Sequence, residues 1–586
     1  MIAKNDLIKL DICAISSEGS GIGRYTDETL TNFVIYVPFC AVGDVIECRM
    51  LKVLSSYAFG KCEKIITPSK TRIAPECKAF GKCGGCTYCH IDYDEELRVK
   101  RETVVGAYKS VFGKNAPAVN AVVPSERKEG YRNKVQFPIT ADGKCGFFAH
   151  HSHRLVDIDG CLLQDKAFAP IVKTFEDYVK ISGASVYDEE SGKGLLRHLY
   201  LRRGTDTNEI CVCIVANGKK LPAEDVLCDM MLAHPEVKSL YLNTNTAATN
   251  VILGDQYRLI RGEKYITDRL CGITVRISPQ SFYQINKAQA ERLYSFGIGL
   301  ADIKADDNVL DLYCGIGGIA DICARYAKRV VGVEIVPEAI DDAKRIARDN
   351  GIENVGFYAS DANDLEKVLG DAGFVPDAVF VDPPRKGLDE KTVSALTKLA
   401  PKKIVYISCN PSSQAKNVRD ILEKARRSGT EYTVSDVTPF DMFPRTAHVE
   451  TVCLLTREIT THDMKLHPEP FEMIKSGKKT IELRLFDEKR QKIKVGDSII
   501  FTETVTGEKL NVKVEKLHRF DSFGELYKSL PLLKCGYTEK TVTEAKPSDM
   551  EEYYSAEEQK RYGVVGIEIS QPKRITDESV VLLSRA

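Results

Sequence analysis

The sequence has no excess of either charge, no apolar run of membrane-spanning length, and no internal repeat or low-complexity tract. Lys and Arg number 82 against 83 Asp and Glu, so a surface that binds nucleic acid can be basic only locally. A membrane-spanning helix needs at least about 18 apolar residues, and the first residues lack the apolar core of a signal peptide. We therefore expect a cytoplasmic protein that does not associate with membranes.

One stretch, residues 95–135, is locally basic. A solvated helix face is the simplest interpretation of such a run, and a nucleic-acid contact is the alternative. Its basic residues are Arg98, Lys100, Arg101, Lys109, Lys114, Arg127, Lys128, Arg132 and Lys134.

The sequence contains 19 cysteines among its 586 residues. Without an export signal, so many cysteines argue against a disulfide framework and for reduced thiols, a metal site or catalysis. The chain is also too long for one core. Domains usually hold roughly 100–200 residues, so we expect about three to five of them.

In the N-terminal half, the sequence pattern predicts a β-barrel before a cysteine-rich segment at 67–92 and an α+β region after it. Residues 1–66 predict a small β-barrel, because strand-like runs at 7–12, 33–37, 45–53 and 60–66 are separated by turns, including a glycine loop at 17–24. Residues 93–115 predict a helix, which opens a central α+β region at 93–290. The strand-like runs of that region are 134–139, 198–203, 210–215 and 239–243.

The pattern changes at residues 291–458, where strand candidates alternate with helical stretches. Such β-α units predict a parallel, doubly wound sheet. After a linker at 458–463, residues 463–572 predict a separate β-rich domain with a helix at 470–476. The strand candidates of the first region are 308–313, 329–334, 354–358, 377–381 and 403–408, and those of the second are 480–485, 498–502 and 509–517.

A glycine-rich loop follows the first strand of the doubly wound region. Gly315 and Gly317 let the backbone approach a ligand, and a helix begins directly after them. The second strand ends at Glu334, where a carboxylate can bind ribose hydroxyls. This pattern fits either a nicotinamide cofactor or S-adenosylmethionine. A nicotinamide-dependent oxidoreductase is therefore a competing interpretation.

Two further turns end strands of the same sheet: Asp382-Pro-Pro-Arg385 after the fourth and Ser408-Cys-Asn-Pro411 after the fifth. Ligands of doubly wound sheets lie at this edge, so these turns favour S-adenosylmethionine. Cys409 lies just past a strand, whereas Cys211, Cys213 and Cys453 fall within strands as structural cysteines do. Glu450 opens an apolar run, where partial burial would raise its pKa and suit a general base.

Residues 1–458 resemble the RNA (uracil-5-)-methyltransferase family, with five motifs in the family's order. These are Ser278-Pro-Gln-Ser-Phe-Tyr-Gln284-Ile-Asn286, Asp311-Leu-Tyr-Cys-Gly-Ile-Gly317, Asp382-Pro-Pro-Arg385, Ile407-Ser-Cys-Asn-Pro411 and His448-Val-Glu450. The resemblance implies that residues 291–458 form a class I, Rossmann-like methyltransferase domain. It also implies that S-adenosylmethionine is the methyl donor and that carbon 5 of a uridine is the acceptor.

The resemblance assigns roles to individual residues. It implies that Cys409 adds to carbon 6 of uracil as the nucleophile and that Glu450 removes the proton from carbon 5 as the base. It implies that the cofactor is held by Gln284, Tyr313, Glu334 and Asp382, with Gly315 and Gly317 in the loop and Asp361 on the adenine side. Gly318 stands where the family can carry a larger residue, so any side-chain contact from that position is lost here.

The cysteines between residues 77 and 89 have metal-ligand spacing. Four local thiolates, Cys77, Cys83, Cys86 and Cys89, could share one zinc ion. The spacing C-x5-C-G-G-C resembles the ribosomal-RNA branch of the family, which implies a 4Fe–4S cluster held by Cys77, Cys83, Cys86 and the distant Cys161. We prefer the second ligand set, and Cys89 competes with Cys161 for the fourth place.

Both ends of the chain resemble RNA-binding modules. The run E-G-x-G-I-G-R at 18–24 resembles the TRAM domain, which is OB-like, although a structural barrel without a ligand is the alternative. The run G-K-K-T-I-E-x-R at 477–484 resembles the ASCH domain, a relative of the PUA barrel. For that domain a stability or partner role, or the hydrolase activity of some ASCH relatives, is the alternative to RNA binding.

We therefore predict a monomeric enzyme that methylates carbon 5 of uridine in 23S ribosomal RNA of the large subunit. The cysteine cluster and the TRAM-like start favour ribosomal RNA over transfer RNA, which is the substrate of another branch. A non-catalytic iron–sulfur RNA-binding factor is a further alternative, against which the pair Cys409 and Glu450 speaks.

Overall fold

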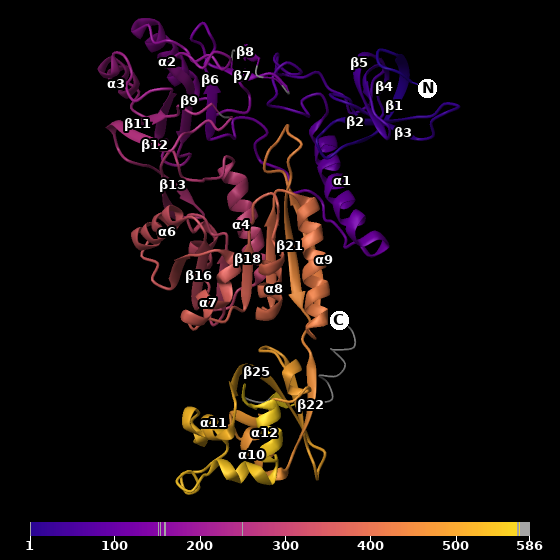
Figure 1. The fold of residues 1–586 in the computed structure, drawn as a ribbon, viewed down its shortest axis with the longest axis vertical. Helices are drawn as coiled ribbons and strands as arrows, with labels where there is room; N and C mark the ends of the chain where they lie inside the picture. Colours follow the sequence, from indigo (N-terminus) through magenta and orange to yellow (C-terminus); the bar gives the residue numbers. More distant parts are fainter. Residues whose placement is uncertain are drawn as a thin grey trace. The chain divides into compact units, whose positions relative to one another are not determined.

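The computed structural model describes residues 2–570, apart from 151, 153, 158, 159 and 249, and residues 573–574. Met1 and residues 571–572, which the predicted domains include, lie outside the described residues. The chain forms two compact units, Met1–Ile421 with Val434–Leu455 and Leu422–Thr433 with Thr456–Ala586, and each is described by itself (Figure 1). None of the helices within the described ranges is long and apolar enough to cross a membrane.

The larger unit begins with a closed five-stranded barrel, as predicted, in the order β1-β2-β3-β5-β4. One detail of the prediction is wrong, because part of the expected glycine loop forms the strand β2. Glycine fits there for a steric reason: a Cβ at Gly23 would lie 2.4 Å from Leu10 Cγ in the barrel interior. The strands are β1 (Leu7–Ile15), β2 (Gly21–Tyr25), β3 (Phe33–Val37), β4 (Val45–Val53) and β5 (Tyr57–Thr67).

Helix α1 (Tyr93–Phe112) follows the cysteine-rich segment and matches the predicted helix. It begins after Asp92, whose side chain accepts a hydrogen bond from Glu95 N at 2.8 Å and so caps the first turn. Lys100 does not belong to a basic surface, as its place in the basic stretch implied. It is 1% exposed, and its Nζ lies 2.6 Å from Asp441 Oδ1, so it neutralises buried carboxylates.

A central sheet follows in the order β12-β11-β10-β9-β6, with β10 parallel to β11 and antiparallel to β9. Every residue of β10 is buried, including Cys211 and Cys213, which are structural as predicted. The elements of this region are η1 (Gly113–Asn115), β6 (Lys134–Pro138), β7 (Gly146–Phe148), β8 (Leu155–Asp157), α2 (Phe168–Ser182), β9 (Leu196–Arg203), β10 (Ile210–Ala216), α3 (Glu224–Leu232), β11 (Val237–Thr244) and β12 (Gln256–Gly262).

The last part of this unit is built on a seven-stranded sheet in the order β17-β16-β15-β18-β19-β21-β20 (Figure 1). The five predicted strands form its parallel part, as the register of β15, β16, β17, β18 and β19 shows. Strands β16 and β17 lie on one side of β15, whereas β18 and β19 lie on its other side, so the strand order reverses between β15 and β18. Such a switch point opens a crevice at the carboxyl ends of the strands.

The elements of this sheet and its helices are α4 (Lys287–Ala301), β15 (Asn308–Leu312), α5 (Gly318–Cys323), β16 (Arg329–Glu334), α6 (Pro337–Asp349), β17 (Val355–Ala359), η2 (Ala362–Asp364), α7 (Leu365–Asp371), β18 (Ala378–Val381), α8 (Glu390–Leu399), β19 (Lys403–Ser408), α9 (Pro411–Arg427), β20 (Tyr432–Phe440) and β21 (Glu450–Arg457). Helix α4 crosses the domain boundary that the sequence predicted at 290, and the hairpin of β13 (Ile266–Leu270) and β14 (Ile273–Ile277) precedes it.

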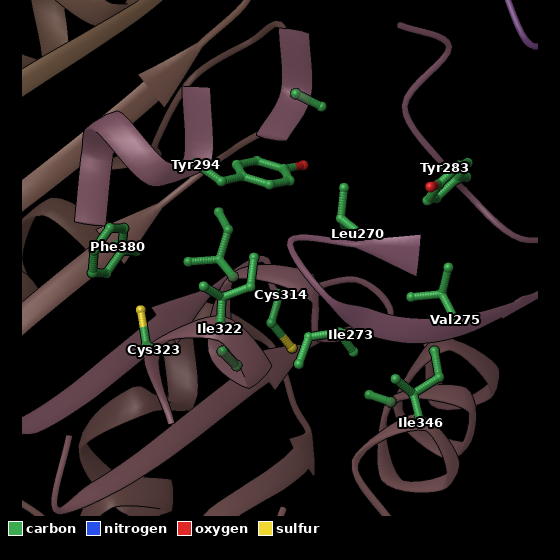
Figure 2. Packing of buried hydrophobic residues seen from close by; sticks show 14 of the residues in the cluster. Leu270, Ile273, Val275, Tyr283, Tyr294, Cys314, Ile322, Cys323, Ile346 and Phe380 are labelled. Carbon is green, nitrogen blue, oxygen red and sulfur yellow. The ribbon is translucent and has the colours of Figure 1, made fainter. Parts of the chain in front are cut away.

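The core of this region is continuous from the hairpin to the sheet. Figure 2 shows Leu270 and Ile273 of the hairpin beside Cys314 and Ile322, while Tyr294 of α4 and Phe380 of β18 lie further along the same cluster. All of these side chains are at most 8% exposed. The hairpin therefore packs against the sheet. This packing fixes the loop at 278–286, which follows the hairpin and precedes α4.

The smaller unit is β-rich, as predicted, with strands in the order β22-β24-β25-β26-β23. The expected linker at 458–463 is wrong from Thr461 onward, because β22 pairs in parallel with the distant β24. The elements are β22 (Thr461–Leu466), α10 (Pro468–Lys475), β23 (Ile481–Leu485), η3 (Arg490–Lys492), β24 (Ser498–Glu503), β25 (Lys509–Phe520), α11 (Phe523–Ser529), η4 (Leu532–Cys535), η5 (Pro547–Glu552), α12 (Ala556–Tyr562), β26 (Val564–Ile569) and β27 (Lys573–Arg574).

Candidate active site

A cavity of about 1300 Å³ lies at the carboxyl ends of the parallel strands. It brings together almost every residue that the sequence singled out for the cofactor and for catalysis. These lining residues are Gln284, Tyr313, Gly315, Glu334, Asp361, Asp382, Cys409 and Glu450. Gly317 is not among the residues that line it. A cavity at this edge of a doubly wound sheet is where such folds bind ligands.

The loop after β15 turns sharply because several of its residues adopt left-handed backbone conformations. Tyr313 has φ 63°, Gly315 φ 52° and Gly317 φ 86°. The first of these is unusual for a residue with a side chain and is held by a hydrogen bond from Tyr313 N to Val333 O at 2.9 Å. A Cβ at Gly317 would lie 2.6 Å from the ring of Phe357, so glycine is needed there for packing rather than for ligand contact.

Glu334, the last residue of β16, is fixed by the backbone around it. Its Oε2 accepts a hydrogen bond from Gly315 N at 3.2 Å, and its Oε1 accepts from Ile335 N at 2.8 Å and Val336 N at 3.1 Å. The carboxylate therefore lies across the glycine loop. Asp361 stands after the neighbouring strand and caps η2 by accepting from Asn363 N at 2.9 Å.

The turn that carries Cys409 is locked to the turn that carries Asp382. Asn410 Nδ2 donates to Arg385 O at 2.9 Å, and Ser413 Oγ donates to the same carbonyl at 3.2 Å. Asn410 Oδ1 also accepts from Ser412 N at 3.1 Å at the start of α9. Cys409 lies directly before these residues and is half-buried. Hydrogen bonds therefore join the two loops directly beside the thiol.

Arg385 lines the same cavity as the Cys409 thiol, and its positive charge acts on that thiol. Burial and the nearby Glu450 carboxylate raise the pKa of Cys409 above its usual value, and the Arg385 charge opposes that rise. Arg385 thus favours the ionised, nucleophilic form of this thiol, whereas burial, Glu450 and Asp382 all oppose it.

Glu450 opens β21 and is 8% exposed, as expected for a carboxylate at the mouth of an apolar strand. Burial and the negative charge of Asp382 raise the pKa of Glu450 well above its usual range, and Arg385 lowers it in part. Burial also raises the pKa of Asp382 to about 7. Perturbed carboxyls beside a thiol in one cavity are typical of a catalytic centre.

Several lining residues were not singled out as site residues from the sequence. Arg385 stands in a motif that was recognised, and its position after a strand was the available signal. His448 lines the cavity too, and burial lowers its pKa, so it is neutral at pH 7. Arg132 and Lys134 reach the cavity from β6 and the segment before it, and nothing local in the sequence separated them from other basic residues.

The predicted cysteine ligands line two adjoining small cavities. Cys77, Cys86 and Cys161 line both, while Cys89 lines the first and Cys83 the second. Cys89 and Cys161 line the same cavity as Cys77 and Cys86, so both alternatives for the fourth ligand lie close to the others. Within the described ranges, no group of three or more His, Cys, Asp or Glu side chains is arranged to hold a metal ion. The donor set nevertheless consists of thiols, which suit zinc or an iron–sulfur cluster.

Comparison with known proteins identifies the two parts of the chain. The family model described as tRNA (uracil-5-)-methyltransferase matches residues 240–458, and the ASCH domain model matches residues 464–573. An uncharacterized RNA methyltransferase of Staphylococcus aureus is 38% identical over 458 residues, which is 77% of this chain and 98% of that protein. One of Clostridium tetani is 38% identical over 459 residues, or 78% of this chain and 97% of that protein.

A solved structure is similar in fold as well as in sequence. The Pyrococcus abyssi tRNA (uracil-54, C5)-methyltransferase in complex with S-adenosyl-L-homocysteine is 28% identical, with a TM-score of 0.61, over 77% of this chain and all of that one. The Rossmann-like methyltransferase fold and the C-terminal ASCH domain that the sequence predicted are therefore confirmed. The chain belongs to the RNA (uracil-5-)-methyltransferase family and is an RNA methyltransferase that carries an ASCH domain over residues 464–573.

Proposed function

We propose that this enzyme transfers a methyl group from S-adenosylmethionine to carbon 5 of a uridine in RNA, with Cys409 as nucleophile and Glu450 as base. The observation that carries the proposal is that the Cys409 thiol and the Glu450 carboxylate line the same cavity as Glu334 and Asp382. The similar structure from P. abyssi holds S-adenosylhomocysteine, which is the product form of this donor.

The cofactor end of the cavity consists of the loop after β15 and its neighbours. We assign the ribose hydroxyls to Glu334, whose carboxylate lies across the Gly315 backbone. We assign Tyr313, Asp361, Asp382 and Gln284 to the same end, because the resemblance implies it and they line the cavity, and we assign Gly317 a role through the shape of the loop. When bound, S-adenosylmethionine supplies an electrophilic methyl group to the cavity.

Carbon 5 of uracil becomes nucleophilic only after a nucleophile has added to carbon 6. The Cys409 thiolate, favoured by Arg385, forms the bond to carbon 6, and the electron pair of the 5,6 double bond moves toward the 4-oxygen. Carbon 5 would then bond to the methyl group, whose bond to the donor sulfur breaks to leave S-adenosylhomocysteine. Glu450 removes the proton from carbon 5, the double bond reforms, and the sulfur–carbon bond breaks to return the thiolate.

For the substrate we propose a uridine of 23S ribosomal RNA, with transfer RNA as the alternative. The cysteine segment and the barrel support ribosomal RNA. The matched family model and the P. abyssi protein are both named for transfer RNA. Mapping 5-methyluridine in ribosomal and transfer RNA from cells that lack the protein decides between them, since only the true substrate loses the modification.

We further propose that Cys77, Cys83, Cys86 and Cys161 hold a 4Fe–4S cluster with a structural or RNA-positioning role, because the reaction contains no redox step. Their places on two adjoining cavities support this ligand set. An anaerobic preparation with a broad brown absorbance and four irons is the expected result. A colourless protein with one zinc ion would assign the site to zinc instead.

The barrel at 1–66 and the ASCH domain are proposed to be RNA-gripping modules of a cytoplasmic, monomeric enzyme. A uridine in folded RNA must leave its stack to reach Cys409, and appended modules supply the binding energy that this step requires. The direct test of the whole proposal is transfer of labelled methyl to RNA by the purified chain. Binding of NADH without binding of S-adenosylmethionine, measured by calorimetry, would overturn it.

A further inference from the structure

The loop at 441–449 joins β20 to β21 and ends directly before Glu450. It extends between the two kinds of cavity in the larger unit. Phe443 and His448 line the active-site cavity, whereas Arg445 lines the first cysteine cavity. The position of the proposed base therefore depends on a loop whose other side faces the cysteines.

Hydrogen bonds fix both the backbone N–H and the backbone carbonyl of Arg445. Its N–H donates to Glu96 Oε1 at 2.7 Å, and its carbonyl accepts from Thr87 N at 2.7 Å and Tyr88 N at 3.1 Å. Its backbone has φ 67°, a left-handed conformation that a long side chain adopts only when neighbours impose it. Its Nη1 also lies 3.5 Å from Glu96 Oε2. Thr87 and Tyr88 follow Cys86 directly in the chain.

The polar contacts continue from Glu96 to the base. Glu96 Oε1 accepts from Lys100 Nζ at 2.8 Å, and Lys100 Nζ also donates to Phe443 O at 3.1 Å. That carbonyl accepts from Thr446 Oγ1 at 2.8 Å.

Thr446 Oγ1 in turn accepts a hydrogen bond from His448 N at 3.3 Å, two residues before Glu450. Glu96 is 0% exposed and Lys100 1% exposed, so water does not compete for the contact between these two side chains. This series of contacts connects Arg445 to the residues that precede Glu450.

We propose that Arg445, together with Glu96, is a positioning residue that sets the place of Glu450 for proton removal and couples that place to the cysteine segment. This inference rests on the proposed function, in which Glu450 is the base. Glu450 takes no part in forming the bond between Cys409 and carbon 6, and its carboxylate only raises the pKa of that thiol. A Glu450 displaced from carbon 5 therefore slows proton removal, whereas the addition step keeps its nucleophile. Misplacing a catalytic group by about 1 Å can cost on the order of 100-fold.

The test compares Arg445→Ala with wild type in steady-state methylation and in trapping of the covalent RNA adduct on denaturing gels. We expect kcat to fall about 10- to 100-fold, the KM for RNA to change less than about threefold, and the adduct fraction to rise. Arg445→Lys should recover most of the activity. Arg269→Ala, an exposed arginine on β13, should behave as wild type.

A purely structural role predicts a different result. If Arg445→Ala loses adduct formation and methylation in parallel, or leaves both unchanged, the inference is overturned. Arg445→Gly, whose backbone accepts the left-handed conformation, is the second variant should the alanine protein be unstable. The double variant Glu96→Gln/Arg445→Ala should lose less activity than the product of the two single losses, because both substitutions remove the ion pair between Arg445 Nη1 and Glu96 Oε2. Additive losses would contradict that.

A separate variant tests the coupling to the cysteine segment. Cys86→Ser should share the adduct accumulation, because Thr87 and Tyr88 carry the hydrogen bonds to Arg445. A raised KM for RNA with an unchanged adduct fraction would overturn the coupling. Glu450→Gln is the reference: if it accumulates no adduct, the proposed function itself fails, and the positioning role falls with it. Failure of the Arg445 variants alone leaves the proposed function standing.

Discussion

The Arg385 carbonyl accepts a hydrogen bond from Asn410 Nδ2 at 2.9 Å, and the positive charge of its guanidinium lowers the pKa of the neighbouring Cys409. One residue of the Asp-Pro-Pro-Arg turn thus acts on the reactive sulfur with its side chain and on the turn that carries this sulfur with its backbone. Because burial and Glu450 raise the pKa of Cys409, this arginine is the group that favours the thiolate against them.

Arg385→Gln should therefore slow addition of Cys409 to the RNA. Loss of the positive charge raises the pKa of Cys409 further, so less thiolate is present at pH 7, and each unit of pKa costs about tenfold in thiolate. Adduct formation in a single turnover, measured against pH, should shift its midpoint toward alkaline pH. Arg385→Lys, which keeps the charge, is the matched control. An unchanged midpoint in Arg385→Gln would remove Arg385 from this role.

Glu450→Gln should accumulate the covalent adduct, since the amide cannot accept the proton from carbon 5. Cys409→Ala should form none. A general base contributes roughly 100- to 10,000-fold, so turnover by Glu450→Gln should fall by that range. Gel-shift of denatured protein with labelled RNA measures the adduct. An active Cys409→Ala enzyme would exclude covalent catalysis.

How far the sequence could foresee this site depends on how local each contact is. Cys409 and Glu450 were placed at a strand end and a strand mouth because motif and hydrophobic pattern are properties of neighbouring residues. The hydrogen bonds of Asn410 and Ser413 to Arg385 O join two turns at different strand ends, and no local pattern specifies contacts of that kind.

The errors have the same origin. The local sequence does not distinguish Lys100 from a surface lysine of a helix, because its partner Asp441 is 341 positions away. Thr461 reads as linker because its strand exists only by pairing with Ser498 and its neighbours. Gly21 and Gly23 read as a loop because glycine usually punctuates strands, whereas here the narrow barrel interior requires it.

The acid limb of the kcat–pH profile should reflect the raised pKa of Glu450. The base is competent only when ionised, so activity falls as the pH drops through that pKa, above the usual carboxyl range. Asp382→Asn removes a negative neighbour that raises this pKa, so the limb should move to lower pH. The profile must be measured at saturating S-adenosylmethionine, because Asp382 also faces the cofactor end. An acid limb that stays at the wild-type pH in Asp382→Asn would show that Asp382 does not raise the pKa of Glu450.

Gly387→Ala should destabilise the turn behind Arg385. Gly387 has φ 80°, and a Cβ there would lie 2.4 Å from Asn417 Oδ1, which accepts from Leu388 N at 2.8 Å. A left-handed conformation costs a residue with a side chain about 1–3 kcal/mol, and the clash adds to it. Thermal unfolding followed by fluorescence should show a lower midpoint. Gly370→Ala in α7, with no atom within 4 Å of the added Cβ, should leave the midpoint unchanged or raise it.

Lys100→Ala should be among the most destabilising single changes in the larger unit. It leaves the carboxylates of Glu96 and Asp441 buried without the cation that lies 2.8 and 2.6 Å from them. Removing one partner of a buried ion pair typically costs about 3–5 kcal/mol, a large part of the roughly 5–15 kcal/mol that stabilises a domain. Chemical denaturation should show a lower midpoint than for Lys109→Ala, an exposed lysine of the same helix. Because Lys100 also donates to Phe443 O, the Lys100→Ala protein that remains folded should turn over slowly. Equal denaturation midpoints for the two variants would show that the buried charge of Lys100 contributes little to the stability of the fold.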